Sequence, residues 1–166
     1  MKSIPAHIKK TLSTQHHQLL NIWEKSIRAT HDFLNEQQIL QIQELIIKHH
    51  YFDHVQLFHV EREQKIVGFI GLAYDKIEML FIAPQYFHQG IEATLIQHAV
   101  SLGIHEVDVN EQNVKALAFY QQYGFRQFAR SELDAEGNPF PILHLRRKPE
   151  AINDLDYHDT EVMKYK

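Results

Sequence analysis

Apolar positions recur at helical spacing in the first third of the chain, and this spacing predicts two helices. The first is expected over residues 15–29 and the second over residues 36–49. The Thr-His-Asp-Phe-Leu segment between them breaks the pattern, and Asn35 is a good N-cap for the second helix. The inward faces carry Leu19, Leu20, Ile22, Trp23 and Ile27 on the first helix, and Ile39, Ile42, Leu45 and Ile46 on the second.

From residue 55 onward the pattern changes to short apolar runs, which are typical of strands. Pro84 ends the third of these runs, and a short loop leads from it to Gly90. Strands are expected over 55–60, 66–72, 76–82, 107–109, 125–133 and 142–147, and helices over 91–102 and 113–123. This order favours one α/β domain over residues 1–148, followed by a polar tail over 149–166.

Composition narrows the classes of protein to which the chain can belong. Its 166 residues suit one domain, and the 44% apolar content is enough for a core. A net charge of −4 without a basic run argues against nucleic acid as a partner. No apolar run approaches the roughly 18 residues of a membrane span, and no apolar segment follows the basic residues at the start. We therefore expect a cytoplasmic protein with no membrane partner.

Cysteine and histidine content bear on metal binding. The chain has no cysteine, which excludes disulfides, a thiolate nucleophile and cysteine metal ligands. It has 13 histidines, and these indicate either a metal site or ordinary surface and partly buried imidazoles. The second interpretation is favoured because the carboxylates are scattered, so no metal is expected. Many of these rings would instead gain charge as the pH falls towards about 6.5.

The segment VDVNEQNVKALAFYQQYGF, residues 107–125, carries the most specific chemistry. It places Asn110 at the end of a strand, Asn113 at the start of a helix, and Tyr120 two turns further along nearly the same face. Each residue also has an ordinary structural interpretation. Asn110 can complete a turn, Asn113 can cap its helix, and Tyr120 can be a core residue with a satisfied hydroxyl.

A second candidate site lies where the strand that ends at Pro84 leads into the helix that begins near Gly90. Free backbone N–H groups and the helix dipole at such a junction favour a pyrophosphate. The alternative is an ordinary crossover connection without a ligand.

Taken together, these features resemble the GNAT (GCN5-related N-acetyltransferase) superfamily over about residues 15–147. The stretch NEQNVKALAFYQQYGF is the strongest match, to the later motif of the superfamily. The stretches IWEKSIRATHDFL and GFRQFARSELDAEGNPFPILHL resemble a small bacterial subgroup described as protein-lysine acetyltransferases. The resemblance implies a mixed, mostly antiparallel central sheet with a splayed strand pair, flanked by helices.

The resemblance also implies a site for acetyl-CoA as co-substrate. The backbone of the third strand would bind the pantetheine arm, and the loop before the next helix would bind the pyrophosphate. Tyr120 would lie near the sulfur and act as general acid for the leaving thiolate. The co-substrate site would comprise Leu80, Phe81, Ile82, Phe87, His88, Gln89, Gly90, Ile91, Glu92, Asn110, Asn113 and Tyr120.

The pyrophosphate loop departs from the family pattern. The family has Gln or Arg, two residues, Gly, one residue, and then Gly or Ala, whereas this chain has Phe87-His88-Gln89-Gly90-Ile91-Glu92. Only the central Gly is kept, and the Glu92 carboxylate would repel phosphate unless its helix turns it outward. The alternative to an active enzyme is therefore a non-catalytic CoA-binding or interaction module on the same scaffold.

The acceptor side is less specific. We expect Glu78 to be the general base, acting through water, because some members of the family have Glu at the matching strand position; the alternative is a solvated carboxylate. His31 is an alternative base or a substrate contact. The acceptor cleft would be lined by Trp23, Ser26, His31 and Phe33, although Trp23 also suits the core. The acceptor would be a primary amine, either a small molecule or a protein lysine, and the resemblance allows a homodimer.

Overall fold

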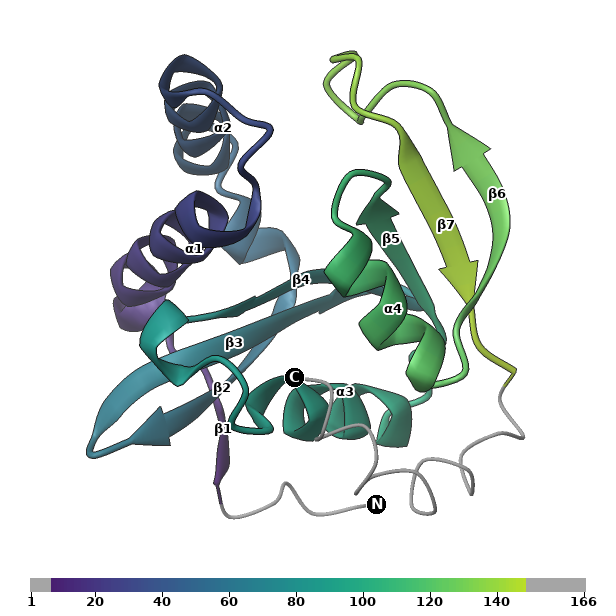
Figure 1. Ribbon diagram of the computed structural model, residues 1–166. Coiled ribbons are helices and arrows are strands. Elements are labelled where there is room, and N and C mark those ends of the chain that lie inside the picture. Colours follow the sequence, from purple (N-terminus) through teal and green to yellow (C-terminus); the bar gives the residue numbers. More distant parts are fainter. Residues whose placement is uncertain (1–6, 149–166) are drawn as a thin grey trace.

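A computed structural model of the chain describes residues 7–148, and within these residues seven strands form one sheet (Figure 1). The strands are β1 (Ile8–Lys10), β2 (Gln56–Arg62), β3 (Lys65–Ala73), β4 (Lys76–Ile82), β5 (Glu106–Asn110), β6 (Arg126–Ser131) and β7 (Ile142–Arg146). The α-helices are α1 (His16–Thr30), α2 (Glu36–Lys48), α3 (Ile91–Ser101) and α4 (Val114–Gln122). Short 3-10 turns are η1 (Ser13–Gln15), η2 (Tyr51–His54) and η3 (Pro84–Tyr86).

The strand order is β1-β2-β3-β4-β5-β7-β6, and every neighbouring pair is antiparallel except β4 and β5. Helices α1 and α2 cover one face of the β2–β4 half, while α3 and α4 lie on the other face (Figure 1). Alternation along β3 explains both layers, because Phe69 packs with the α1 side and Ile70 packs with the α3 side. Both side chains are fully buried.

The parallel pair β4–β5 separates almost at once. Its described pairing consists of Lys76 with Glu106 and Ile77 with Val107. On the other edge of β4 the pairing with β3 shifts at Glu78, because Leu72 faces Ile77 while Gly71 faces Met79. Such a bulge bends a strand and increases its twist. The bulge and the short pairing together open a V between the strands (Figure 1).

The expected fold class is confirmed: the sheet is mixed, mostly antiparallel, splayed at one pair and flanked by helices. Helix and strand boundaries agree to within about two residues, the usual uncertainty of helix ends. Strand β1 was not expected, because three residues, one of them apolar, carry no periodic signal. The expected polar tail lies outside the described residues. Within residues 7–148, no helix combines the length and apolarity that a membrane crossing requires.

Candidate active site

The start of α3 supplies the backbone donors of the candidate site. Gly90 is the N-cap with a φ of 79°, and no side chain caps this helix end. The first N–H groups of a helix have no partner within the helix, so they point out of its end as donors. His88, two residues earlier, has a φ of 65°, which is an unusual left-handed conformation for a residue with a side chain. The loop thus has the strained backbone that is often found at binding sites.

Glu92 lies in the first turn of the same helix and is partly buried. Its charge reaches Tyr120 on α4, where it contributes to raising the pKa of the phenol. The Glu92 carboxylate, at the start of α3, therefore interacts electrostatically with Tyr120 on α4. This is the one residue of the loop whose charge opposes an anionic ligand.

Tyr120 is almost completely buried, with 6% of its surface exposed. Its ring makes edge contacts with Phe119 and Phe125, at centroid distances of 5.4 and 5.6 Å. Burial raises the pKa of the phenol well above its usual range, and the charge of Glu92 adds to this effect. The hydroxyl therefore keeps its proton at neutral pH, which is the state that a proton donor needs.

Glu78 lies in the bulge of β4, directly after the last β4–β5 pair, and its side chain is exposed to solvent. Neighbouring protein still removes part of its hydration, and this desolvation is the main cause of a raised pKa. The positive charge of Lys76 lowers the pKa, whereas the negative charge of Asp108 raises it. A carboxylate with a raised pKa holds a proton more readily, which suits a general base.

The two asparagines of the conspicuous segment have structural roles. The side-chain oxygen of Asn113 accepts a hydrogen bond from the backbone N–H of Ala116 at 3.1 Å, which caps α4. The side-chain oxygen of Asn110 accepts from the backbone N–H of Gln112 at 2.9 Å. Both ordinary interpretations are therefore confirmed. A ligand here would contact the NH₂ side of either amide.

The four candidate acceptor residues separate into two groups. His31 and Phe33 lie together between α1 and α2, with ring centroids 5.1 Å apart, and Phe33 meets Phe140 of the β6–β7 connection at 6.0 Å. Trp23 and Ser26 are buried at 4% and 5% exposure on the core face of α1. The core interpretation of Trp23 is therefore confirmed.

His31 is a poor candidate for the base. Burial lowers the pKa of its imidazole to about 4, and the nearby negative charge of Asp32 only partly offsets this effect. Its Nδ1 is also 2.8 Å from the hydroxyl of Thr30. The ring is neutral at physiological pH, so it can contact a substrate but takes up a proton less readily than an ordinary histidine.

A groove of about 360 Å³ lies between α2 and the β6–β7 connection. Its apolar part is formed by Ile42, Leu45 and Phe140, and its rim carries the Glu44 and Glu136 carboxylates, the Lys48 ammonium and three side-chain amides. At one end the Tyr51 hydroxyl donates a hydrogen bond to Glu136 at 2.9 Å. This contact and the Phe33–Phe140 contact join the helical side of the cleft to the β6–β7 side.

Sequence reasoning missed a polar network next to Glu78. It contains Lys76, Asp108, Ser131 and His144, which come from four different strands. Asp108 alternates with the buried Val107 and Val109, and this alternation is a visible signal for a side chain on the opposite face. The register that brings the four residues together depends on β7 lying between β5 and β6, which no local pattern indicates.

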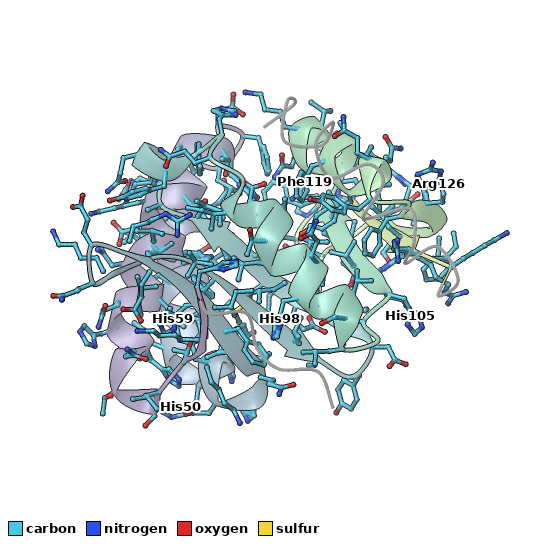
Figure 2. All side chains as sticks on the ribbon, turned by 90° about the horizontal axis from the view of Figure 1, so that it is seen from below. His50, His59, His98, His105, Phe119 and Arg126 are labelled. Carbon is cyan, nitrogen blue, oxygen red and sulfur yellow. The ribbon has the colours of Figure 1, made fainter. Side chains whose placement is uncertain are left out.

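The histidines among residues 7–148 lie in several parts of the fold, and two of them, His16 and His50, approach Asp53 with Nδ1–Oδ distances of 3.7 and 3.8 Å. Figure 2 shows His50 and His105 at the edge of the molecule, while the buried His59 and His98 lie within it. His59 is held by the Thr11 hydroxyl and the Glu61 carboxylate, at 2.7 and 2.9 Å. Among residues 7–148, no group of three His, Asp or Glu side chains is arranged to hold a metal ion.

Comparison with known proteins bears on this geometry. A family model described as "Acetyltransferase (GNAT) domain" matches residues 18–142. The peptidyl-lysine N-acetyltransferase YjaB of Salmonella typhimurium is 35% identical over 142 residues, which are 84% of this chain and 96% of that protein. The Escherichia coli K12 protein of the same name is 34% identical over 141 residues, which are 83% of this chain and 94% of that protein.

Solved structures have the same fold. The solution structure of apo-form YjaB from Escherichia coli matches with a TM-score of 0.75 at 32% identity, covering 84% of this chain and 95% of that one. The PaiA N-acetyltransferase of Thermoplasma acidophilum, solved in complex with coenzyme A, matches with a TM-score of 0.64 at 19% identity. That match covers 84% of this chain and 97% of the other, and it supports the fold alone.

Proposed function

This chain belongs to the GNAT family of acetyltransferases, and from that membership we propose that it transfers the acetyl group of acetyl-CoA to the side-chain amine of lysine in a peptide or protein. The observation that carries the proposal is the early end of the β4–β5 pairing at Ile77 and Val107. Beyond that point the edge of β4 is free of β5, as a strand that hydrogen-bonds a ligand arm must be. The lysine acceptor is suggested by the names of the two relatives.

The residues present fit acetyl-CoA in most respects. The β4 backbone over Leu80, Phe81 and Ile82 would hold the pantetheine arm, and the N–H groups around Gly90 would hold the pyrophosphate. Phe87, His88, Gln89 and Ile91 would form the rest of that loop. Asn110, at the end of β5, and Asn113, the N-cap of α4, would contact the co-substrate. When bound, acetyl-CoA supplies an acetyl group that is activated as a thioester.

Two residues would move the protons. Glu78 would accept, through water, the proton that the amine loses as its nitrogen bonds to the acetyl carbon. Tyr120 would donate its proton to the sulfur as the carbon–sulfur bond breaks. The raised pKa of Glu78 suits proton acceptance, because the carboxylate then holds a proton more readily. The raised pKa of Tyr120 keeps the phenol protonated before transfer, although it also makes the phenol a weaker acid.

The groove beside α2 supports a peptide acceptor. Side-chain amides such as Gln38, Gln41 and Asn138 can pair with the backbone of an extended chain, and Phe140 continues the groove to Phe33 and His31. The Glu44 and Glu136 carboxylates favour a segment that carries positive charge near the acceptor lysine.

The proposal is tested by mixing the protein with acetyl-CoA and a panel of lysine peptides and small polyamines, and by measuring thiol release and peptide mass. We expect peptides to gain one acetyl group each, and turnover to fall about 100-fold in Glu78→Gln. Acetylation of polyamines alone would contradict the lysine acceptor. Binding of acetyl-CoA without transfer to any amine would favour the non-catalytic module.

A further inference from the structure

Three side chains form a hydrogen-bonded chain across β5, β7 and β6. The Oδ1 atom of Asp108 lies 2.6 Å from Nδ1 of His144, and Nε2 of the same ring lies 2.7 Å from the Ser131 hydroxyl. The strand register explains the contact, because Asp108 is directly opposite His144 in the β5–β7 pair. All three side chains lie on the face of the sheet opposite the buried Val107 and Val109.

The hydrogen-bonded chain also extends to β4, the strand that carries Glu78. The other carboxylate oxygen of Asp108, Oδ2, accepts a hydrogen bond from the ammonium of Lys76 at 3.0 Å. Lys76 is on β4, two residues before Glu78, at the point where β4 and β5 part. Both carboxylate oxygens of Asp108 are therefore hydrogen-bonded. Its negative charge lies between Lys76 on β4 and His144 on β7.

The other charged groups on this face have partners of their own. Arg146 of β7 pairs with Glu106 of β5 at 3.7 Å and lies over the Phe128 ring of β6 at 3.9 Å. Arg130 of β6 precedes Ser131 and is opposite the buried Leu143, so it lies on the other face, where it pairs with Glu111 at 2.6 Å. The described charges that act on Glu78 itself are Lys76 and Asp108.

We propose that Asp108, held between Lys76 and His144, is a positioning residue that sets the pH range over which Glu78 can accept a proton from the acceptor amine. The inference rests on Glu78 being the base of the proposed function. Asp108 acts through its charge, because both of its oxygens are occupied. The Lys76 ammonium opposes that charge, and the His144 ring holds the carboxylate by a hydrogen bond.

The signs of these effects are fixed by electrostatics. A negative neighbour disfavours the ionised form of Glu78, and a positive neighbour favours it. These directions agree with the effects of Asp108 and Lys76 on the pKa of Glu78. Removal of Asp108 must therefore let Glu78 ionise at lower pH, whereas removal of Lys76 must require higher pH.

The experiment measures kcat/KM against pH, with acetyl-CoA and one lysine peptide, for Asp108→Asn, Lys76→Gln and His144→Gln. We expect the acidic limb to move down by about 0.5 to 1 pH unit in Asp108→Asn and up by about the same amount in Lys76→Gln. His144→Gln keeps the charges of both Asp108 and Lys76, so its limb should lie between those of the other two variants. The control is His105→Gln, a histidine outside the network whose Nδ1 lies 2.8 Å from the Gly103 carbonyl oxygen, and its limb should match the unmodified protein.

A purely structural network would lower activity in all three variants without moving the limbs in opposite directions. If Glu78→Gln abolishes activity but the limbs of Asp108→Asn and Lys76→Gln coincide, the inference is wrong while the base remains. If Glu78→Gln keeps full activity and an unchanged limb, the base assignment is wrong, and the inference fails with it. Melting temperatures of each variant identify any loss of activity that comes from unfolding.

Discussion

Tyr120 and Glu92 act on each other across the gap between α3 and α4. Burial keeps the phenol protonated, and the negative charge of Glu92 adds to that effect. The same charge stands in the first turn of α3, where a phosphate would bind. One carboxylate would therefore help to keep the proposed proton donor protonated, and it would repel the phosphates of the proposed co-substrate. Mutations of the two residues should therefore have different effects: loss of the Tyr120 hydroxyl should lower kcat, and loss of the Glu92 charge should strengthen CoA binding.

For Tyr120→Phe we expect kcat to fall by about 100-fold with little change in CoA affinity, because the variant loses a proton donor and keeps the ring. The measurement is steady-state kinetics together with CoA binding by calorimetry. Tyr123→Phe is the matched control, since Tyr123 is also buried, at 2% exposure, and follows the same helix. An equal loss of kcat in both variants would contradict the role of Tyr120.

For Glu92→Gln we expect the Kd for CoA to fall several-fold, because a carboxylate near the phosphates is replaced by a neutral amide of the same shape. The gain should shrink as salt is added, since screening weakens the repulsion that the mutation removes. Glu63→Gln, in the exposed turn between β2 and β3, serves as the control. An unchanged Kd at low salt would show that Glu92 does not face the phosphates.

At the scale of elements, the start of α3 combines a backbone constraint with the proposed binding of the pyrophosphate. Gly90 has a left-handed φ of 79°, and the N–H groups that follow it are not covered by a capping side chain. Gly137 in the β6–β7 connection has a similar φ of 81°, and a Cβ added there would meet no atom within 4 Å. The two glycines therefore share a left-handed backbone conformation, and only Gly90 lies at the start of α3.

Alanine at either glycine should cost about 1 to 2 kcal/mol of unfolding free energy, because a side chain disfavours the left-handed conformation. Urea unfolding measures this cost. Only Gly90→Ala should also weaken CoA binding, which calorimetry detects. If Gly137→Ala weakened CoA binding as much, the effect would come from stability rather than from the helix start.

The sequence predicted elements well where one local pattern decides them. Asn35 caps α2 by accepting from the Gln38 backbone N–H at 2.8 Å, as its position before an apolar helix indicated. Local sequence patterns did not predict the features that depend on pairing between residues far apart in the chain. Strand β1 exists because Ile8 pairs with Val60. The contact of Asp108 with His144 exists because β7 inserts between β5 and β6.

At the scale of the whole molecule, two apolar clusters on opposite faces of the sheet each enclose or adjoin a histidine. His98 of α3 stacks edge-on against Phe58 at 4.5 Å in the cluster on the α3 side, and burial lowers its pKa. His31 lies at the end of α1 on the other side, where burial lowers its pKa to about 4. Both rings are held neutral in the folded protein, so acid should weaken both faces of the sheet.

The stability of the protein should therefore fall as the pH drops from about 6.5 to 4, because the unfolded chain binds a proton at His31 that the folded chain rejects. Above about pH 6.5, His31 does not change the free energy of unfolding. Below about pH 4, its effect is complete, and the free energy of unfolding is lower by about 3 kcal/mol or less. Urea unfolding at several pH values measures the slope. His31→Gln should give a shallower slope, and the exposed His17→Gln should not. Equal slopes in all three proteins would contradict the buried neutral state of His31.

Within residues 7–148, two residue pairs join β4 to β5, so the two halves of the sheet are connected over a short length. A ligand arm that lies along the free edge of β4 and reaches Asn110 and Asn113 would contact both halves of the sheet and hold them together. Binding of the first substrate would then reduce the relative motion of the α1–α2 side and the β6–β7 side, which together bound the acceptor groove. Such coupling favours a compulsory order of binding, in which the co-substrate enters first and the amine follows.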